Sequence, residues 1–400
     1  MKLIRNIFFI IMSSILIGAL LLISVYLIPT DKINENIFNT PDSFSVKAEL
    51  FSWAGLPLKS PFTVSFGTTD KYMMQISASN YNASAIFKAM LNPIDSQNNF
   101  YPRYWHGYTI FLKPLLYFFD VNQIKFINAF LQIILLAFVS FKIYKIFGLK
   151  LLIAFLITII FIDPVSSAIC LAYSPMYYIM LFAVMYVLKK NFYLIENQNY
   201  IYFFLIAGIV TAFFDFLTYP LITLGIPLIF YVLLNNNFAS SKKIYDILKF
   251  SIYWSFGYAS MWSGKWVISY LLTGYNTFAN AFNAMTERTQ GFNEYFGQNI
   301  NIKLALSRIT QNFNILIFVV IFLCIMAGII FYIARILIRN KYYFYEILPL
   351  ILISLYPFGW YLILQNHSVL HYYFTNKILS VSLFAMMCAI IQLNKLKGKA

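Results

Sequence analysis

Two of the three histidines in this chain lie in one short stretch, NHSVLHYYFTNK, at residues 366–377. His367 and His371 are four positions apart, so a helix would place both rings on one face. Zinc enzymes use this spacing, but Ser368 stands where a zinc protease has its glutamate. We therefore expect the imidazoles, together with Lys377, to donate hydrogen bonds to an anionic group such as a phosphate. Capping of a helix start by the NHS segment is the structural alternative.

Carboxylates that could act as a general base or bind a divalent metal are concentrated in the segment 30–123. They are Asp31, Glu35, Asp42, Glu49, Asp70 and Asp95. Asp70 differs from the others because TTDKYMMQISAS is typical of a helix start, with Thr68 or Thr69 as the cap. A carboxylate there lies at the favourable end of the helix dipole, so an ordinary first-turn acid is the structural alternative.

The chain that carries these residues has the composition of an integral membrane protein. Its 400 residues are 61% hydrophobic and 20% aromatic, and only 11% are charged, whereas soluble domains carry about 25% charge. The net charge of +15 comes from small basic clusters between apolar runs, which indicates positive-inside topology and argues against nucleic-acid binding. Cys170, Cys324 and Cys388 are an odd number without C-x-x-C spacing, so we expect buried thiols.

The first apolar stretch, residues 8–28, follows Lys2 and Arg5 and is too long for a cleaved signal peptide. We interpret it as a retained anchor with a cytoplasmic N-terminus. Apolar length and the distribution of lysine and arginine together predict ten spans, with both termini in the cytoplasm and the basic clusters on that side. The predicted spans are 7–29, 124–147, 150–171, 173–188, 200–218, 219–234, 247–273, 313–338, 345–364 and 372–393.

The predicted fold is a single all-α polytopic membrane domain that occupies residues 1–400. Residues 107–119 are too short to span and contain Lys113 and Pro114. Counting them as a crossing would invert every later loop, so we expect a helix in the outer interface. The first outer loop is then residues 30–123, with interfacial helices. A second, polar outer loop covers 274–312. The abundance of Ile, Asn, Lys, Phe and Tyr is typical of AT-rich genes, and we expect a multi-pass protein of a bacterial cell membrane.

Ionisable residues of the spans converge on the outer leaflet. Asp163 precedes Pro164, which predicts a local helix break. Asp215 and Lys265 lie near the outer ends of their spans, and all three histidines fall on the same side. Charged groups within a membrane are costly and mark functional sites by default. A transporter would concentrate such groups near the midplane, so their common depth favours a site at the outer surface. The structural alternative is that each one is an interfacial or helix-capping residue.

The segment YPRYWHGYTIFLKPLLYFFDVNQIKFINAFLQIILLAFVSFKIYKIFG, residues 101–148, follows the anchor and the long outer loop. This order resembles the start of the GT-C membrane glycosyltransferases, which include protein mannosyltransferase-like and aminoarabinose transferase-like enzymes. The resemblance covers roughly residues 1–150. It implies that Asp70 is the catalytic base or a metal-site residue, although Lys71 stands where many members have a second acid. It also implies that His106 corresponds to the family's entry histidine, although YPRYWHGY replaces the usual His-Pro-Pro.

The resemblance implies transfer of a sugar from a polyprenyl-phosphate carrier to a cell-envelope glycan, lipid or protein acceptor at the outer face. A lipid-linked donor holds its phosphate at head-group depth, where the chain also supplies aromatic rings for a sugar to stack on, among them Tyr104, Trp262 and Trp266. We expect Asp70 to deprotonate the acceptor hydroxyl. The expected substrate-binding residues are Arg103, Trp105, His106, Asp215, Lys265, His367, His371 and Lys377.

No cofactor is assigned, although a divalent metal is compatible with the carboxylates. Two other functions stay open for the chain. One is a polysaccharide repeat-unit polymerase, because the 274–312 loop carries Arg288 and Arg308. The other is a non-catalytic transporter or flippase for lipid-linked sugars. The predicted cytoplasmic turns are short and lack a Gly-rich phosphate loop, which argues against a nucleotide-sugar donor.

Overall fold

The computed structural model describes residues 2–38, 66–94, 99–196, 199–293, 298–300 and 341–397, with Leu304, Gly328 and Ala334 as isolated positions. Regular structure in these ranges is helical, apart from the antiparallel pair β1 (Phe292–Asn293) and β2 (Gln298–Asn299). The cysteines Cys170 and Cys388 are buried free thiols, as expected. Cys324 lies outside the described residues.

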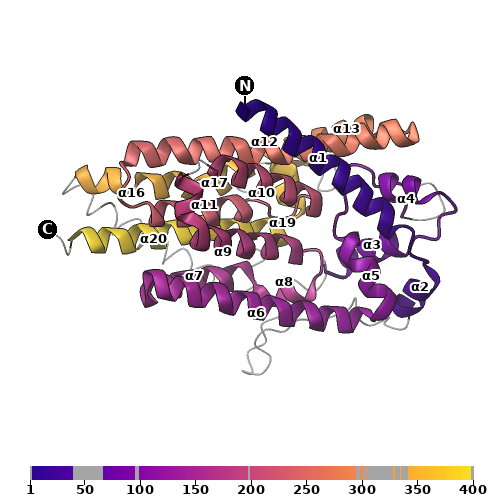
Figure 1. Ribbon diagram of the computed structural model, residues 1–400, viewed down its shortest axis with the longest axis horizontal. Coiled ribbons are helices and arrows are strands. Elements are labelled where there is room, and N and C mark those ends of the chain that lie inside the picture. The colour runs from indigo at the N-terminus through magenta and orange to yellow at the C-terminus, as the bar shows by residue number, and fades with distance from the viewer. Residues whose placement is uncertain are drawn as a thin grey trace.

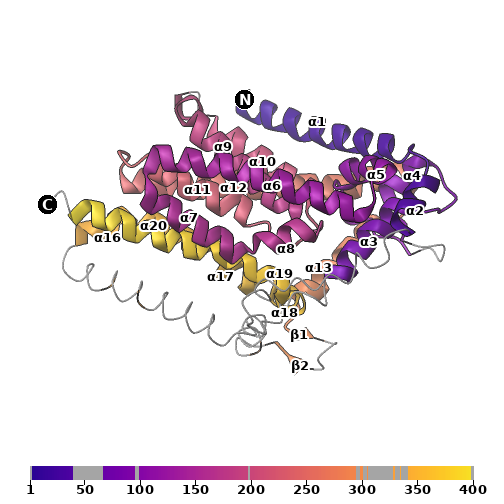
Figure 2. The same ribbon diagram turned by 90° about the horizontal axis from the view of Figure 1, so that it is seen from below.

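The helices of the main bundle lie side by side along its length (Figures 1 and 2). They are α1 (Lys2–Val25), α6 (Val121–Phe147), α7 (Leu149–Ile162), α9 (Ser174–Glu196), α10 (Tyr200–Phe214), α11 (Ile222–Leu234), α12 (Ser240–Thr273), α16 (Lys341–Ser354), α17 (Tyr356–Ile363) and α20 (Leu379–Lys397). Short helices from the predicted first outer loop gather at one end, on the right of Figure 1. They are α2 (Asp31–Phe38), α3 (Phe66–Ala78), α4 (Ala85–Leu91) and α5 (Thr109–Phe118).

The remaining short helices connect the bundle elements. They are α8 (Pro164–Ile169), α13 (Thr277–Thr289), α18 (Gln365–Leu370), α19 (Tyr372–Thr375) and the 3-10 turn η4 (Asn376–Ile378). In Figure 2, α13, α18 and α19 lie close together near the end of the bundle that also carries α3. Helix α5 falls within residues 107–119, where the sequence predicted a short helix.

Five helical segments of the described chain are long and apolar enough to cross a membrane. They are Lys2–Val25, Val121–Phe147, Ser174–Glu196, Tyr342–Ile363 and Asn376–Leu396. Shorter apolar helices cover Thr109–Phe118, Leu149–Ile162, Tyr200–Phe214 and Ile222–Leu234. These helices agree with an all-α membrane protein. The predicted number of ten spans is not confirmed, and the span predicted at 313–338 lies outside the described residues except for Gly328 and Ala334.

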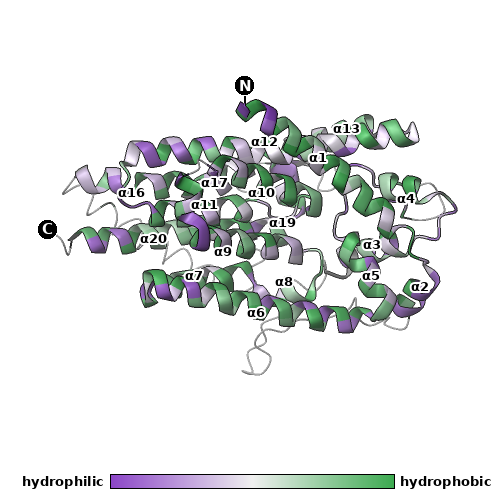
Figure 3. Cartoon of the chain, viewed as in Figure 1, coloured by the Kyte–Doolittle hydropathy of each residue, from purple (hydrophilic) through white to green (hydrophobic). Residues whose placement is uncertain are grey.

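Hydrophobic residues dominate α1, α7 and α10 in Figure 3, whereas α12 shows hydrophilic residues at its left end. Helix α12 begins there with Lys242 and Lys243, and α6 and α20 end on the same side with Lys145 and Lys395 (Figure 1). The short helices α2 to α5 lie at the opposite end of the bundle. The bundle therefore has one lysine-rich end, and the candidate site described below lies towards the other.

Helices α10 and α12 approach each other closely because each has a glycine at the contact. A Cβ on Gly208 would lie 2.0 Å from the Trp254 carbonyl oxygen, and one on Gly257 would lie 2.2 Å from the Leu205 carbonyl oxygen. Small residues at such contacts allow the close backbone packing that holds helices together in membranes. The contact fixes the middle of α10 against the middle of α12.

The predicted break at Asp163 is confirmed. Asp163 has a left-handed φ of 62°, and its Oδ1 accepts a hydrogen bond from the Ser166 N–H at 3.0 Å. It thereby ends α7 and caps α8, whose first residue is Pro164. A proline at the first helical position needs no N–H donor and has its φ already set for a helix. The chain therefore turns at this point without leaving the bundle.

Three buried lysines share one arrangement, in which the ammonium group donates to a carbonyl in the last turn of a helix. The pairs are Lys113 with Ser77 of α3 at 2.7 Å, Lys265 with Ala89 of α4 at 2.8 Å, and Lys377 with Ile162 of α7 at 2.6 Å. Helix C-termini carry partial negative charge and carbonyls without intrahelical partners, so a cation there satisfies both. These lysines attach short helices to the bundle.

Replacing Lys377 by methionine is expected to lower the thermal unfolding temperature of the purified protein. The change leaves the Ile162 carbonyl and the Ser166 hydroxyl without the donor that now lies 2.6 and 2.7 Å away. Burying an acceptor without a partner costs about 1–3 kcal/mol. The matched control is Lys395→Met on the exposed side of α20. Equal unfolding temperatures for the two variants would contradict the capping role.

Candidate functional site

The residues that follow α10 form a buried turn at 215–218, here called the 215–218 turn. The Oδ1 of Asp215 accepts hydrogen bonds from the N–H and the hydroxyl of Thr218, at 2.8 and 2.6 Å. Its Oδ2 accepts from the Tyr258 hydroxyl of α12 at 3.2 Å. Leu217 has a φ of 70°, which is strained for a side chain of this size. Strained backbone of this kind clusters at functional sites.

The Asp215 carboxyl group accepts three hydrogen bonds, two from Thr218 and one from Tyr258, and donors of this kind stabilise its ionised form. The 215–218 turn therefore holds a buried negative charge against α12.

His106 lies in the loop before α5 and stacks on Phe216 of the 215–218 turn, with ring centroids 6.4 Å apart and an interplanar angle of 22°. Its Nε2 lies 3.2 Å from the Tyr101 carbonyl oxygen, and its Nδ1 lies 3.0 Å from the Tyr108 hydroxyl. Nε2 therefore carries the proton, and Nδ1 accepts. Burial lowers the pKa of His106 to about 3, so the ring is neutral at pH 7. Both ring nitrogens are engaged within the protein.

Arg103 is fixed at the edge of the same region. Its carbonyl oxygen accepts hydrogen bonds from the indole N–H groups of Trp262 and Trp266, at 2.7 and 3.1 Å. Its guanidinium carbon lies 4.2 Å from the ring centroid of Tyr101, a cation–π contact. Its Nη1 donates to the Asn280 side chain of α13 at 3.3 Å. The buried Nε–H of Arg103 has no hydrogen-bond partner among the described residues.

Arg288, near the end of α13, supplies a second guanidinium group. Its Nη1 donates to the Ala284 carbonyl of its own helix at 2.8 Å, and its buried Nε has no hydrogen-bond partner in the described ranges. Its charge acts on its neighbours. Burial raises the pKa of Tyr104 to about 12, and the Arg288 charge opposes this rise. Burial also lowers the pKa of His367, and the Arg288 charge lowers it further.

The predicted histidine pair lies within reach of the Arg288 charge. The rings of His367 and His371 have centroids 4.7 Å apart, which confirms that the two side chains are neighbours. The Nε2 of His367 lies 2.7 Å from the Leu217 carbonyl oxygen, so this nitrogen carries the proton and donates. The Nδ1 of His367 is buried without a hydrogen-bond partner in the described chain. Asn366 donates to the Glu287 carbonyl at 2.6 Å and so ties α18 to α13.

Burial and the nearby Arg288 charge lower the pKa of both histidines, that of His371 to about 4. Both imidazoles are therefore neutral at pH 7. The single N–H of neutral His367 already donates to Leu217, so its open Nδ1 can accept a hydrogen bond or a proton.

We call this assembly the Asp215 cluster. It consists of Tyr101, Arg103, Tyr104, His106, Asp215, Tyr258, Trp262, Arg288, His367 and His371. Two permanent guanidinium charges accompany one carboxylate and neutral imidazoles, so the cluster has a surplus of positive charge. Tyr104 stacks on Trp262, with centroids 5.7 Å apart and an interplanar angle of 22°, which adds an aromatic surface. Buried N–H groups without partners favour the binding of an anion rich in acceptor oxygens.

Asp70 contacts a different part of the bundle, the turn between α8 and α9. Its Oδ1 accepts from the Ala172 N–H and the Cys170 thiol, at 3.1 and 3.3 Å, and its Oδ2 accepts from the Leu171 N–H at 3.1 Å. Burial raises the pKa of Asp70, while Lys125 and these three donors oppose the rise. The carboxylate thus anchors α3, in the predicted first outer loop, to the start of α9. Its role as catalytic base stays a prediction.

The predicted start of the helix that carries Asp70 is wrong. Helix α3 begins at Phe66, so Asp70 lies more than one turn inside it and neither Thr68 nor Thr69 is the cap. The polar TTD run resembles a cap sequence, but helix formation continues through it. Among the other loop acids, Asp31 and Glu35 are exposed on α2. Asp42, Glu49 and Asp95 lie outside the described residues.

Three of the predicted substrate-binding residues support the site and do not join the Asp215 cluster. The Trp105 indole donates to the Met261 carbonyl at 2.6 Å and is fully buried. The Lys265 ammonium lies 5.4 Å from the ring centroid of Trp105 and donates to α4. Lys377 donates to the end of α7 and lies 3.9 Å from an Asp163 carboxylate oxygen. Their proposed contact with phosphate stays a prediction, since each polar group already has a partner in the protein.

The described residues contain no group of three or more His, Cys, Asp or Glu side chains that could hold a metal ion. Comparison of the chain with protein-family models, with curated proteins and with solved structures returned no match. The argument about function therefore depends on the geometry of the site.

Five members of the Asp215 cluster were not among the predicted substrate-binding residues. Tyr104 and Trp262 were predicted only as rings for a sugar to stack on, and Tyr101, Tyr258 and Arg288 had no predicted role in the transferase site. Tyr258 lies four positions before Trp262, so a helical wheel of α12 places both on one face. Tyr101 lies two positions before Arg103 in an aromatic loop. Arg288 had a weaker signal, a single cation in the polar TERTQGFNEYF segment, and only the packing of α13 against α18 brings it to the histidines.

Proposed function

We propose that the chain is a membrane glycosyltransferase that moves a sugar from a polyprenyl-phosphate carrier to a cell-envelope glycan, lipid or protein acceptor. The observation that carries this proposal is a pair of arginines, Arg103 and Arg288, whose buried Nε–H groups have no hydrogen-bond partner among the described residues, in the cluster that also holds the Asp215 carboxylate. Guanidinium groups are the preferred protein donors for phosphate oxygens. The Tyr104–Trp262 stack offers a surface for the apolar face of a sugar.

The proposed reaction is a displacement at the anomeric carbon. The acceptor hydroxyl oxygen forms a bond to that carbon, the bond to the phosphate oxygen breaks, and the polyprenyl phosphate leaves with the electron pair. Arg103 and Arg288 stabilise the charge on the departing phosphate. The ionised Asp215 stabilises the positive charge that develops on the sugar ring, as carboxylates do in other glycosyl transfers.

The proton of the acceptor hydroxyl needs a base. The resemblance to GT-C enzymes implies Asp70, but three donors already occupy its carboxylate. His367 has the geometry that a general base requires: a neutral ring, a tautomer fixed by the Leu217 carbonyl and an open Nδ1. We therefore assign the proton transfer to His367 and a structural role to Asp70.

A repeat-unit polymerase is the second candidate, and one observation favours it. Arg288 comes from the predicted second outer loop and contributes to the cluster, and an arginine in that loop is what a polymerase would need. Both candidates use a lipid-linked sugar and the same phosphate contacts, and they differ in the acceptor.

Deletion of the gene, followed by glycan analysis of the cell envelope, separates these candidates. The proposed transferase predicts the loss of one specific sugar substituent and its recovery when the wild-type gene is returned. Loss of chain length alone would support the polymerase. Envelope glycans of unchanged composition and chain length would contradict both.

A further inference from the structure

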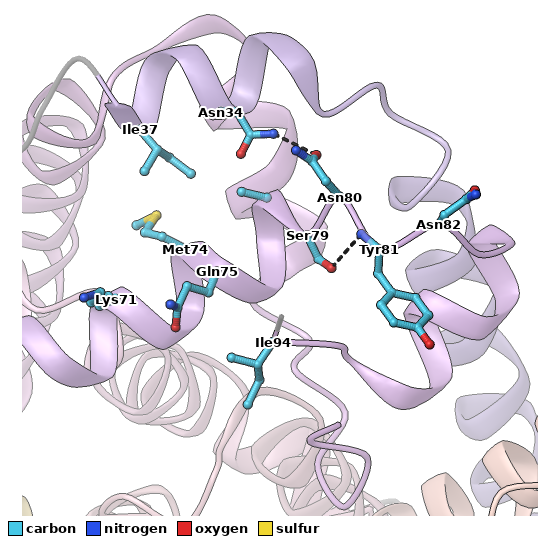
Figure 4. A pocket seen from close by; sticks show the side chains of 11 residues that line it. Asn34, Ile37, Lys71, Met74, Gln75, Ser79, Asn80, Tyr81, Asn82 and Ile94 are labelled. Atoms are coloured by element: carbon cyan, nitrogen blue, oxygen red, sulfur yellow. Dashed lines mark hydrogen bonds between the residues drawn. The ribbon is translucent and has the colours of Figure 1, made fainter. Parts of the chain in front are cut away.

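A cavity of about 840 Å³ opens between α2, α3 and the turn at residues 79–82, outside the Asp215 cluster (Figure 4). Its walls carry the carboxamides Asn34, Gln75, Asn80 and Asn82. Cavities of this size hold small organic ligands, and a few convergent polar groups give them specificity. None of the described residues that line it belongs to the site described above.

The amide groups of this cavity are only partly used within the protein. The Asn80 Oδ1 accepts hydrogen bonds from the Asn34 Nδ2 and the Thr30 hydroxyl, both at 2.9 Å. This leaves the Asn80 Nδ2 and the Asn34 Oδ1 without partners in the described chain, and the same holds for the side-chain amides of Gln75 and Asn82. Figure 4 shows the Asn34–Asn80 hydrogen bond at one side of the cavity and Gln75 on α3 at another.

A carboxamide both donates and accepts, and a sugar hydroxyl does the same, so the two match group for group. Ile37, Met74 and Ile94 add apolar wall, and Tyr81 supplies an aromatic ring. The one charged side chain among the described lining residues is Lys71, and no carboxylate is among them. The described lining residues fit a neutral or acidic saccharide.

Helix α3 joins this cavity to the bundle. Lys71, Met74 and Gln75 line the cavity, while the adjacent Asp70 is anchored to the turn before α9. We propose that the cavity binds a saccharide unit of the acceptor glycan, which deepens the proposed function and rests on it. An acceptor glycan would then contact the protein both at the Asp215 cluster and in this cavity. This additional contact would favour glycan acceptors over lipid or protein acceptors.

Saturation-transfer difference NMR on the full-length protein in lipid nanodiscs tests the site directly. The probes are the methyl glycosides of glucose, galactose, N-acetylglucosamine and rhamnose. At least one probe is expected to receive saturation from the wild type and to bind about tenfold more weakly to Gln75→Leu/Asn82→Leu, because two hydrogen bonds are lost. The matched control, Asn283→Leu on an exposed face of α13, should bind like the wild type.

Two further measurements keep the outcome decisive. Asn82 is exposed, so Asn82→Leu alone serves if the double variant does not fold. Farnesyl phosphate binding is measured in parallel. The affinity for farnesyl phosphate should be unchanged in the cavity variants and weaker in Arg288→Gln. Failure of the saccharide site can therefore be distinguished from failure of the phosphate site. The inference is overturned if no probe gives a signal that depends on Gln75 or Asn82.

Discussion

Replacing Arg288 by glutamine is expected to slow sugar transfer about 10- to 100-fold, since a hydrogen bond to a charged group contributes about 1.5–3 kcal/mol. The Arg288 charge acts on Tyr104 and His367. Its buried Nε–H has no hydrogen-bond partner among the described residues, and we propose that this group binds a phosphate oxygen. Glutamine keeps the polar character but removes the charge. Transfer is measured with the purified protein and a polyprenyl-phosphate sugar.

Arg288→Lys should fall between the wild type and Arg288→Gln. Lysine restores the positive charge but lacks the planar fork that binds two phosphate oxygens at once. The matched control is Lys88→Gln, which removes a cation from α4, outside the Asp215 cluster. This variant is expected to transfer sugar at the wild-type rate. If Arg288→Gln folds and transfers sugar at the wild-type rate, Arg288 has no role in donor binding.

Replacing Asp70 by asparagine is expected to lower the stability of the whole protein. The carboxylate accepts from Leu171, Ala172 and Cys170, and an amide nitrogen would meet at least one of these donors. Each buried donor left without an acceptor costs about 1–3 kcal/mol. The expected result is a lower thermal unfolding temperature and a smaller folded fraction, measured by differential scanning fluorimetry in detergent.

Asp31→Asn, at the exposed start of α2, is the matched control and should unfold like the wild type. The resemblance to GT-C enzymes makes a different prediction for Asp70→Asn, namely full stability with loss of transfer. Normal thermal stability together with absent transfer would therefore restore Asp70 as the base and remove that role from His367.

Some features of the fold follow from local sequence alone. Pro164 after Asp163 dictates a helix break wherever the segment lies, and that break is present. The four-residue spacing of His367 and His371 brings their rings together for the same local reason. Apolar length places most of the helices, although the predicted number of spans depends on residues that the structure does not describe.

The roles of the buried lysines could not be predicted in this way. Lys265 and Lys377 reach carbonyl groups 176 and 215 positions away, and only tertiary packing determines which helix end lies within reach. A charged residue inside a membrane span suggested ligand binding, yet a helix C-terminus offers the same favourable partner. Arg288 shows the reverse case, because a polar loop gave little sign that its guanidinium group would be buried beside two histidines.

The central claim is that the Asp215 cluster binds the phosphate of a lipid carrier. Its most direct test is calorimetric titration of farnesyl phosphate into the purified protein, with farnesol as the control that lacks the phosphate. We predict that Arg288→Gln binds farnesyl phosphate at least about tenfold more weakly than the wild type. The two proteins should have the same affinity for farnesol. Equal affinity of the wild type and Arg288→Gln for farnesyl phosphate would contradict the account.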